Sequence, residues 1–221
     1  VTMSFRRNRR LLGNVTLVAD GFLAPITAGN FIDLCLRNFY QGLPIRFTKK
    51  RLGGSSDFDV ANLPVLGSFQ DGFYDPLTAK LRRIPLEIVR VEKTSSVPVL
   101  SYSQGLANLF GKASLEPTAN KLPLLSFAIQ GLVAMNHPDK NANGGSSEFF
   151  ALQKDSVAEG KRDLLDGEYA PFGYIVEGME VFENLRASDV LESTEVDDWG
   201  QLNLVKVRQS SFQEVVQGSN S

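Results

Sequence analysis

Short segments in which apolar and polar residues alternate recur along the chain, and turn-forming residues separate them. A period of two places successive side chains on opposite faces of an extended strand, so each segment can bury one face. In residues 14–20, Val15, Leu17 and Ala19 face one side, and Asp20-Gly21 then marks a turn. About eight such strands indicate a mainly β, mostly antiparallel protein and favour a closed barrel. The segments that we interpret as strands are residues 1–5, 14–20, 43–48, 84–90, 131–136, 148–152, 172–176 and 201–207.

Two or three short helices are expected besides the strands. Thr27 is typical of an N-cap, and the apolar residues of 28–36 recur at spacings of three and four. This pattern places Cys35 on the apolar face, which predicts a core thiol. A second short helix is expected at residues 179–185, and a third could form near residues 106–110.

Composition excludes several classes of function. The chain has 221 residues, and 23 Lys and Arg against 25 Asp and Glu give a net charge of -2, which argues against a general nucleic-acid binder. With one Cys and one His, neither a disulfide within the chain nor a zinc site of the Cys/His type can form. No apolar run reaches the roughly 18 residues that a membrane span needs, so we expect no transmembrane segment.

We interpret residues 1–221 as a single domain with an insertion at about residues 91–126. The insertion is irregular and proline-rich, and neither flank carries enough apolar sequence for a second core. No secretory signal or transit peptide is visible at the N-terminus, so we expect either a protein that stays where it is made or a processed or trimmed form. The first residue is Val1 and not Met, which favours processing or trimming.

Two polar segments allow more than one interpretation. Residues 6–10 contain four arginines, which predicts a solvated β-hairpin loop or a docking patch for an acidic partner or anionic lipid headgroups. His137 lies in a polar loop with Asp139, which could suggest a catalytic or metal-binding role. One His without a cluster of carboxylates is more often a loop residue, and we favour that interpretation.

Ordered motifs lie at residues 24–34, 39–44, 134–136, 145–150 and 165–179. Together these segments resemble the cyclophilins, a family of peptidyl-prolyl cis-trans isomerases. This resemblance implies an eight-stranded antiparallel barrel capped by two or three short helices, proline-containing protein segments as partners, and no cofactor or metal.

A narrower resemblance is to the divergent thylakoid-lumen cyclophilins of plants and algae, and residues 20–31, 75–88 and 165–174 carry it. Those proteins have an insertion after a Pro-Leu-Glu-Ile strand, where this chain has residues 91–126. The resemblance implies the chloroplast thylakoid lumen as the location and photosystem subunits at the lumenal membrane face as candidate partners.

Rotation about an X–Pro bond has a barrier of ~18–20 kcal/mol, and a catalyst must favour the twisted amide over both planar forms. In cyclophilins an apolar pocket holds the proline ring, and an Arg donates to the prolyl nitrogen. The family pattern for the strand with this donor is Phe-His-Arg, whereas this chain has Ile45-Arg46-Phe47. Phe47 therefore replaces the catalytic Arg. Since neighbouring side chains on a strand point to opposite faces, we expect Arg46, the only candidate donor, to face away from the pocket unless a bulge re-aims it.

The resemblance assigns the remaining site residues position by position. Phe150 matches the floor of the proline pocket, and Leu165 matches a pocket Leu. Other positions depart from the family: Leu66 replaces a Gln, Asn136 replaces an Ala, Leu164 replaces a Trp and Tyr169 replaces a His. The predicted substrate-binding residues are Phe150, Leu165, Leu164, Tyr169, Met135, Asn136, Leu63 and Leu66.

Three hypotheses remain open at this point. The first is a working prolyl isomerase. The second, which the altered donor positions favour, is a cyclophilin-like module without catalysis that acts in binding, assembly or structure on a photosynthetic membrane complex. The third is a different enzyme on a β-barrel that uses His137.

Overall fold

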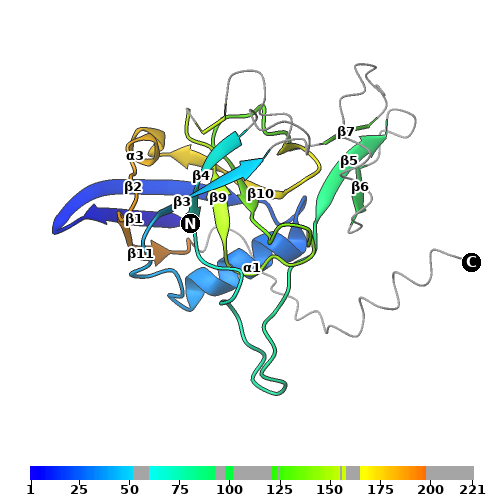
Figure 1. The fold of residues 1–221 in the computed structure, drawn as a ribbon, viewed down its shortest axis with the longest axis horizontal. Helices are drawn as coiled ribbons and strands as arrows, with labels where there is room; N and C mark the ends of the chain where they lie inside the picture. The colour runs from blue at the N-terminus through cyan, green and yellow to red at the C-terminus, as the bar shows by residue number, and fades with distance from the viewer. Residues whose placement is uncertain are drawn as a thin grey trace, which may run out of the picture.

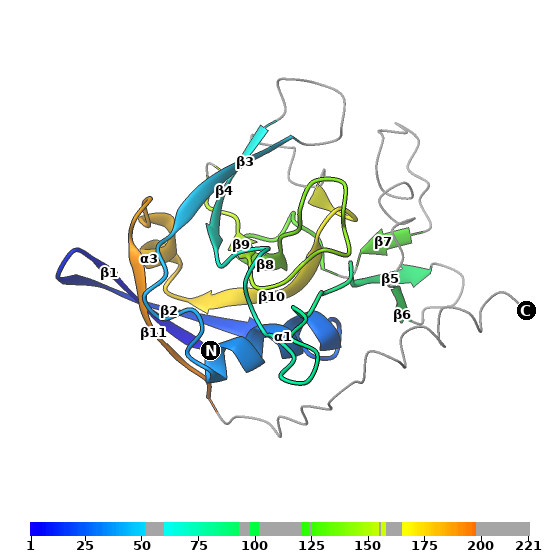
Figure 2. The same cartoon turned by 60° about the horizontal axis from the view of Figure 1, so that its bottom comes forward.

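A curled eight-stranded antiparallel sheet dominates the computed structural model, with helix α1 (Pro25–Leu36) packed against it (Figures 1 and 2). The strand order is β11-β1-β2-β10-β8-β9-β4-β3. The structure describes residues 1–51, 60–92, 98–101, 121–123, 125–154, 156–157 and 165–197. The strands of the sheet are β1 (Thr2–Arg7), β2 (Arg10–Ala19), β3 (Arg46–Arg51), β4 (Val60–Leu66), β8 (Leu132–Met135), β9 (Phe149–Ala151), β10 (Ala170–Glu177) and β11 (Val190–Glu195).

Backbone hydrogen bonds join the two ends of this sheet. Residues 42–45, which lead into β3, pair with residues 188–191 at the start of β11: Leu191 N–H donates to the Leu43 carbonyl at 3.0 Å, and Ile45 N–H donates to the Asp189 carbonyl at 2.7 Å. The predicted mainly β, eight-stranded antiparallel barrel is therefore confirmed. The expected short helix after β10 is also present, as α3 (Met179–Glu183).

Helix α1 begins earlier than the sequence suggests. Its first residue is Pro25 and its N-cap is Ala24, so the expectation that Thr27 is the N-cap is wrong. Proline suits the first helical position because its missing N–H would have no partner there. The free N–H groups of Ile26 and Thr27 instead donate to the carboxylate of Glu87, at 3.2 and 2.7 Å, from a residue about sixty positions away.

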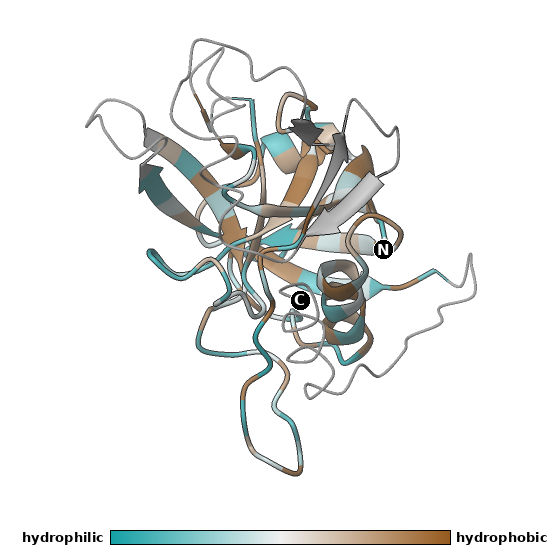
Figure 3. Ribbon diagram, turned by 90° about the vertical axis from the view of Figure 1, so that its right-hand side faces the viewer, coloured by the Kyte–Doolittle hydropathy of each residue, from teal (hydrophilic) through white to brown (hydrophobic). Residues whose placement is uncertain are grey.

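The barrel interior holds the larger of two apolar clusters. Apolar residues gather on the central strands and on α1 (Figure 3), and Phe31 of the helix contacts the rings of Tyr40, Phe149 and Phe172. Cys35 belongs to this cluster, and burial raises the pKa of its thiol to about 12. The prediction of a core thiol is confirmed.

Three strands between residues 88 and 123 form a small second sheet beside the barrel, in the order β6-β5-β7. Its strands are β5 (Ile88–Glu92), β6 (Pro98–Ser101) and β7 (Lys121–Pro123). The strand expected at residues 201–207 and the helix near 106–110 lie outside the described residues, and the single-domain interpretation stays a prediction.

Two strands of the barrel have no counterpart in the expected set. Strand β4 follows a polar Gly/Ser segment that is typical of a loop. It also contains Pro64, and proline is unfavourable in central strands, so the local sequence does not predict a strand here. Strand β11 is mostly polar and has few buried positions, so its alternation is weak. Within the described residues, no helix is long and apolar enough to cross a membrane.

Candidate functional site

Strand register decides which face of the sheet carries the candidate site. Arg46 of β3 lies opposite Val65 of β4, Val65 lies opposite Phe150 of β9, and Phe150 lies opposite Ala134 of β8. Residues directly opposite one another in an antiparallel pair have side chains on the same face. Arg46 therefore lies on the same, outer face of the barrel as Phe150.

This finding contradicts the expectation that Arg46 faces away from Phe150. The β3–β4 pairing runs from Arg46 to Arg51 without a register shift, so no bulge re-aims the arginine. Phe47, opposite Pro64, is the residue that turns inward, and its side chain packs against the barrel-interior cluster. Alignment with the family motif predicts the wrong face of the sheet for Arg46. That face is set by the pairing of β3 with β4, which the motif does not specify.

Arg46 is held by two acceptors. One guanidinium nitrogen, Nη2, lies 2.6 Å from Oε2 of Glu148 and also donates to the backbone carbonyl of Gly67. The Arg46 side chain is 52% exposed, whereas that of Glu148 is 5% exposed. The ion pair thus lies at the boundary between solvent and protein, with the carboxylate on the inner side.

A second contact fixes the other oxygen of this carboxylate. Asn136 Nδ2 donates to Glu148 Oε1 at 2.7 Å, and the Asn136 N–H donates to the Glu148 carbonyl at 2.8 Å. Burial raises the pKa of Glu148, while the positive charge of Arg46 opposes that shift. Glu148 therefore orients both the arginine and the amide that replaces the family's alanine.

The apolar part of the site is a compact cluster on the same outer face. Phe127 stacks on Phe150 with ring centroids 5.9 Å apart and an interplanar angle of 8°, and Tyr169 meets Phe150 edge-on at 5.1 Å. Phe150 is 1% exposed, and Leu63 and Leu165 are 0% exposed. Since these side chains cover one another, the Phe150 ring is not accessible to a proline ring in this conformation.

The structure brings only part of the predicted site together. Leu63, Phe150, Leu165 and Tyr169 belong to the outer cluster, and Asn136 joins it through Glu148. Two predicted residues, Leu66 and Met135, instead belong to the barrel-interior cluster, because they pair with Phe149 and not with Phe150. Leu164 lies outside the described residues.

His137 lies beside the outer apolar cluster, where its ring contacts two backbone carbonyls and the ring of Tyr169. Its Nδ1 and Nε2 lie 2.9 and 2.8 Å from the backbone carbonyls of Pro138 and Glu168, and its ring stacks on Tyr169 at 4.9 Å. Asp139, its neighbour in the loop, pairs with Lys50 at 2.7 Å. Among the residues that the structure describes, no group of three metal-binding side chains is present.

Three residues of this surface are not among the site residues predicted from the sequence. Val65 continues the alternation of Leu63 along β4, a signal that the neighbouring Pro64 concealed. Phe127 and Lys50 come from segments without regular alternation, and only long-range pairing brings them to the site.

The fold is an antiparallel β-barrel with a buried apolar cluster and an arginine–glutamate ion pair on its outer face. Sequence comparison gives the family. The chain belongs to the cyclophilin type peptidyl-prolyl cis-trans isomerase family, whose sequence model matches residues 2–209.

Two related proteins agree with the narrower resemblance. A protein named as a thylakoid lumen peptidyl-prolyl cis-trans isomerase of Synechocystis sp. is 37% identical over 187 residues, which cover 83% of this chain and 44% of that protein. The chloroplastic peptidyl-prolyl cis-trans isomerase CYP38 of Arabidopsis thaliana is 36% identical over 182 residues, which cover 81% of this chain and 37% of that protein. The chain thus spans less than half the length of each.

Solved structures share the fold at low sequence identity. The crystal structure of cyclophilin AquaCyp293 from Hirschia baltica matches with a TM-score of 0.52 and 16% identity, over 87% of this chain and 72% of that one. A cyclophilin type isomerase of Cryptosporidium parvum, crystallised in the presence of the dipeptide Ala-Pro, matches with a TM-score of 0.50 and 16% identity, over 87% and 96% of the two chains. At this identity the likeness concerns the fold alone.

Proposed function

We propose that this chain is a cyclophilin domain of the chloroplast thylakoid lumen that acts mainly as a binding, assembly or structural module of a photosynthetic membrane complex. The named locations of the two relatives support the compartment. The role in a complex, with photosystem subunits as candidate partners, extends the narrower resemblance of the sequence to lumenal cyclophilins.

One observation carries the non-catalytic part of this proposal. Phe150, the residue at the floor of the family's proline pocket, is 1% exposed and is packed between Phe127 and Tyr169. A prolyl substrate would have to displace one of these rings, which removes apolar contact from the folded protein before any substrate contact forms.

The donor side of the site supports the same conclusion. The positions at which the family has its Arg and its Gln hold Phe47 and Leu66, and both belong to or pack against the barrel interior. Arg46 is held in place by Glu148 and Gly67 through Nη2, so donation from this nitrogen to a prolyl nitrogen would require it to give up these acceptors. If such a donor were worth a thousandfold in rate, its loss would raise the barrier by about 4 kcal/mol.

A second candidate function is an active prolyl isomerase. It is favoured by one specific observation, the position of Arg46 on the same face as Phe150. In this alternative, a bound peptide would replace Glu148 as the partner of the guanidinium while Tyr169 or Phe127 moves aside.

A protease-coupled assay on Xaa-Pro peptides separates the two candidates. We expect the wild-type chain and the Arg46→Ala variant to give the same rate as buffer. The matched control is Arg37→Ala, which removes a similarly exposed arginine whose ion pair with Asp33 lies on α1. Activity that Arg46→Ala abolishes and Arg37→Ala retains would establish the isomerase instead.

The binding role has its own test. The tagged chain is incubated with detergent-solubilised thylakoid membranes, and the co-purifying proteins are identified. We expect photosystem subunits to be enriched over a control with an unrelated barrel protein. Enrichment of no lumenal or membrane component would contradict the assembly role even if isomerase activity is absent.

A further inference from the structure

The hairpin between β1 and β2 carries a basic group that the candidate site does not use. Strands β1 and β2 are joined by a two-residue turn, with Arg7 opposite Arg10, and Asn8 adopts a positive φ of 55°. The hairpin projects away from the body of the barrel (Figure 1). We call residues 6–11 the basic hairpin tip.

Charge in this chain is unevenly distributed because of the basic hairpin tip. It carries four arginines in six residues, whereas the whole chain has a net charge of -2. Without these four positive charges the rest of the chain would have a net charge of -6. The molecule is therefore acidic overall with a concentrated basic point, and that asymmetry would orient it in the field of a negatively charged object.

Within the part of the chain that the structure describes, only one of the four arginines has an acidic partner. Arg7 donates to both carboxylate oxygens of Asp189, at 2.7 and 2.8 Å, and to the Asn184 carbonyl at 3.0 Å. These bonds tie the basic hairpin tip, at the residue just before the turn, to the segment before β11. Arg6 donates to the Asn8 carbonyl, which stiffens the turn without neutralising the charge.

Arg9 and Arg10 are exposed, and neither side chain forms a hydrogen bond or ion pair with the described residues. The predicted β-hairpin is therefore present, and exposed cations lie at its end. Leu11, the next residue, is 58% exposed. The tip thus presents charge and apolar surface together.

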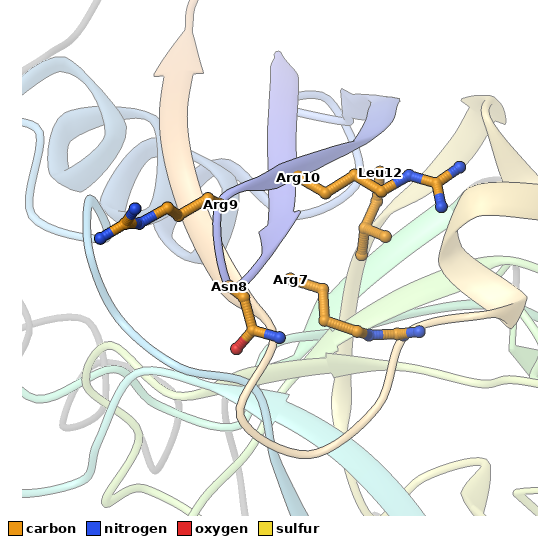
Figure 4. A pocket seen from close by; sticks show the side chains of 5 residues that line it. All are labelled: Arg7, Asn8, Arg9, Arg10 and Leu12. Carbon is orange, nitrogen blue, oxygen red and sulfur yellow. The ribbon is translucent and has the colours of Figure 1, made fainter.

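The shape of the basic hairpin tip restricts the kind of partner that it can bind. Arg7, Asn8, Arg9, Arg10 and Leu12 line a shallow hollow of about 410 Å³, but the guanidinium groups point in different directions and do not converge on one point (Figure 4). A single carboxylate or phosphate needs donors that converge. Divergent cations next to an exposed leucine fit an extended surface of many anionic groups over an apolar layer.

We propose that the basic hairpin tip attaches this domain peripherally to a bilayer that contains anionic lipids. The arginines contact lipid phosphates, and Leu11 enters the boundary between headgroups and acyl chains. Each basic residue near such a surface contributes about 1 kcal/mol, a factor of about five in partitioning. The attachment does not depend on whether the candidate site isomerises prolines.

Sedimentation with lipid vesicles tests the proposal on the whole chain. We expect binding to vesicles of phosphatidylcholine mixed with phosphatidylglycerol, no binding to phosphatidylcholine alone, and a loss of binding as salt is added, because added ions screen the attraction. The double variant Arg9→Gln/Arg10→Gln should lower the partition coefficient on the anionic vesicles roughly 25-fold.

The control variant also removes two positive charges, but from the surface outside the hairpin. Lys80→Gln/Lys140→Gln changes two exposed lysines outside the hairpin, and circular dichroism confirms that both double variants are folded. We expect the control to bind the anionic vesicles within twofold of wild type. Equal losses in the two variants, binding to neutral vesicles, or binding to polyglutamate but not to anionic vesicles would overturn the proposal. The last of these results would identify an acidic protein as the partner.

Discussion

The two faces of strands β3, β4 and β9 are built from different kinds of residue. On the inner face, Phe47 and Phe149 pack against the larger apolar cluster, in which the Tyr40 hydroxyl donates to the Ser147 carbonyl. On the outer face, Phe150 belongs to a smaller apolar cluster, with the pair of Arg46 and Glu148 at its edge. Apolar packing therefore dominates the inner face, whereas pH and salt can act on the ion pair at the edge of the outer cluster.

The largest expected effect comes from the inner face. Phe149→Ala removes a ring that contacts Phe31 and Tyr40 at centroid distances of 5.1 and 5.3 Å. We expect it to lower the free energy of unfolding by about 3–5 kcal/mol, as measured by denaturant titration. The control Phe22→Ala, at a side chain that is 98% exposed, should change it by less than about 0.5 kcal/mol. A similar loss in both variants would contradict the assignment of the two environments.

A second variant tests the inward orientation of position 47. Phe47→Arg restores the residue type of the family's catalytic position, but it directs a cation toward the barrel interior. We expect a loss of roughly 2–4 kcal/mol in unfolding free energy and no gain in isomerase activity. Wild-type stability together with new activity would show that position 47 reaches the outer face.

The smallest expected effect is a difference in how pH changes the contributions of two buried carboxyl groups, Glu148 and Asp189, to stability. Burial raises the pKa of Glu148 above 4.5, so its folded form binds the proton more tightly than the unfolded chain does. The contribution of Glu148 to stability therefore decreases as pH rises from 4.5 through the folded pKa. The hydrogen bond from Arg7 lowers the pKa of Asp189 below 3.8, so its contribution is present above 3.8 and is lost as pH falls through the folded pKa.

Thermal unfolding over an acidic pH series measures this contrast. Relative to wild type, Glu148→Gln should become less destabilising as pH rises above 4.5, and Asp189→Asn should become less destabilising as pH falls below 3.8. The two variants serve as controls for each other. Parallel pH profiles would contradict the opposite directions of the two pKa shifts.

Much of the fold follows from local sequence. The alternation in residues 14–20 and the buried run at residues 131–136 correspond to β2 and β8, because burial on one or both faces leaves a pattern in the residues themselves. The helix pattern around Cys35 was also readable, and the thiol is buried. The first residue of α1 could not be predicted from the local sequence, because the carboxylate that accepts hydrogen bonds from its first N–H groups belongs to Glu87.

The candidate site was only partly predictable for the same reason. The order of its motifs indicated the family, and Phe150, Leu165 and Tyr169 do lie together. Their roles in substrate binding stay predictions, as does the role of Arg46. Leu66 and Met135 lie on the inner face because their strand partner is Phe149, which motif matching along one strand cannot reveal.

The sequence by itself determined the barrel class, the family and the residue types available for chemistry, since alternation and motif order are properties of the chain alone. Tertiary structure decided the face of Arg46, the closure of the cluster around Phe150 and the tie between Arg7 and Asp189. Side-chain direction reverses with every one-residue change of strand pairing, and that pairing is set by segments far apart in the chain.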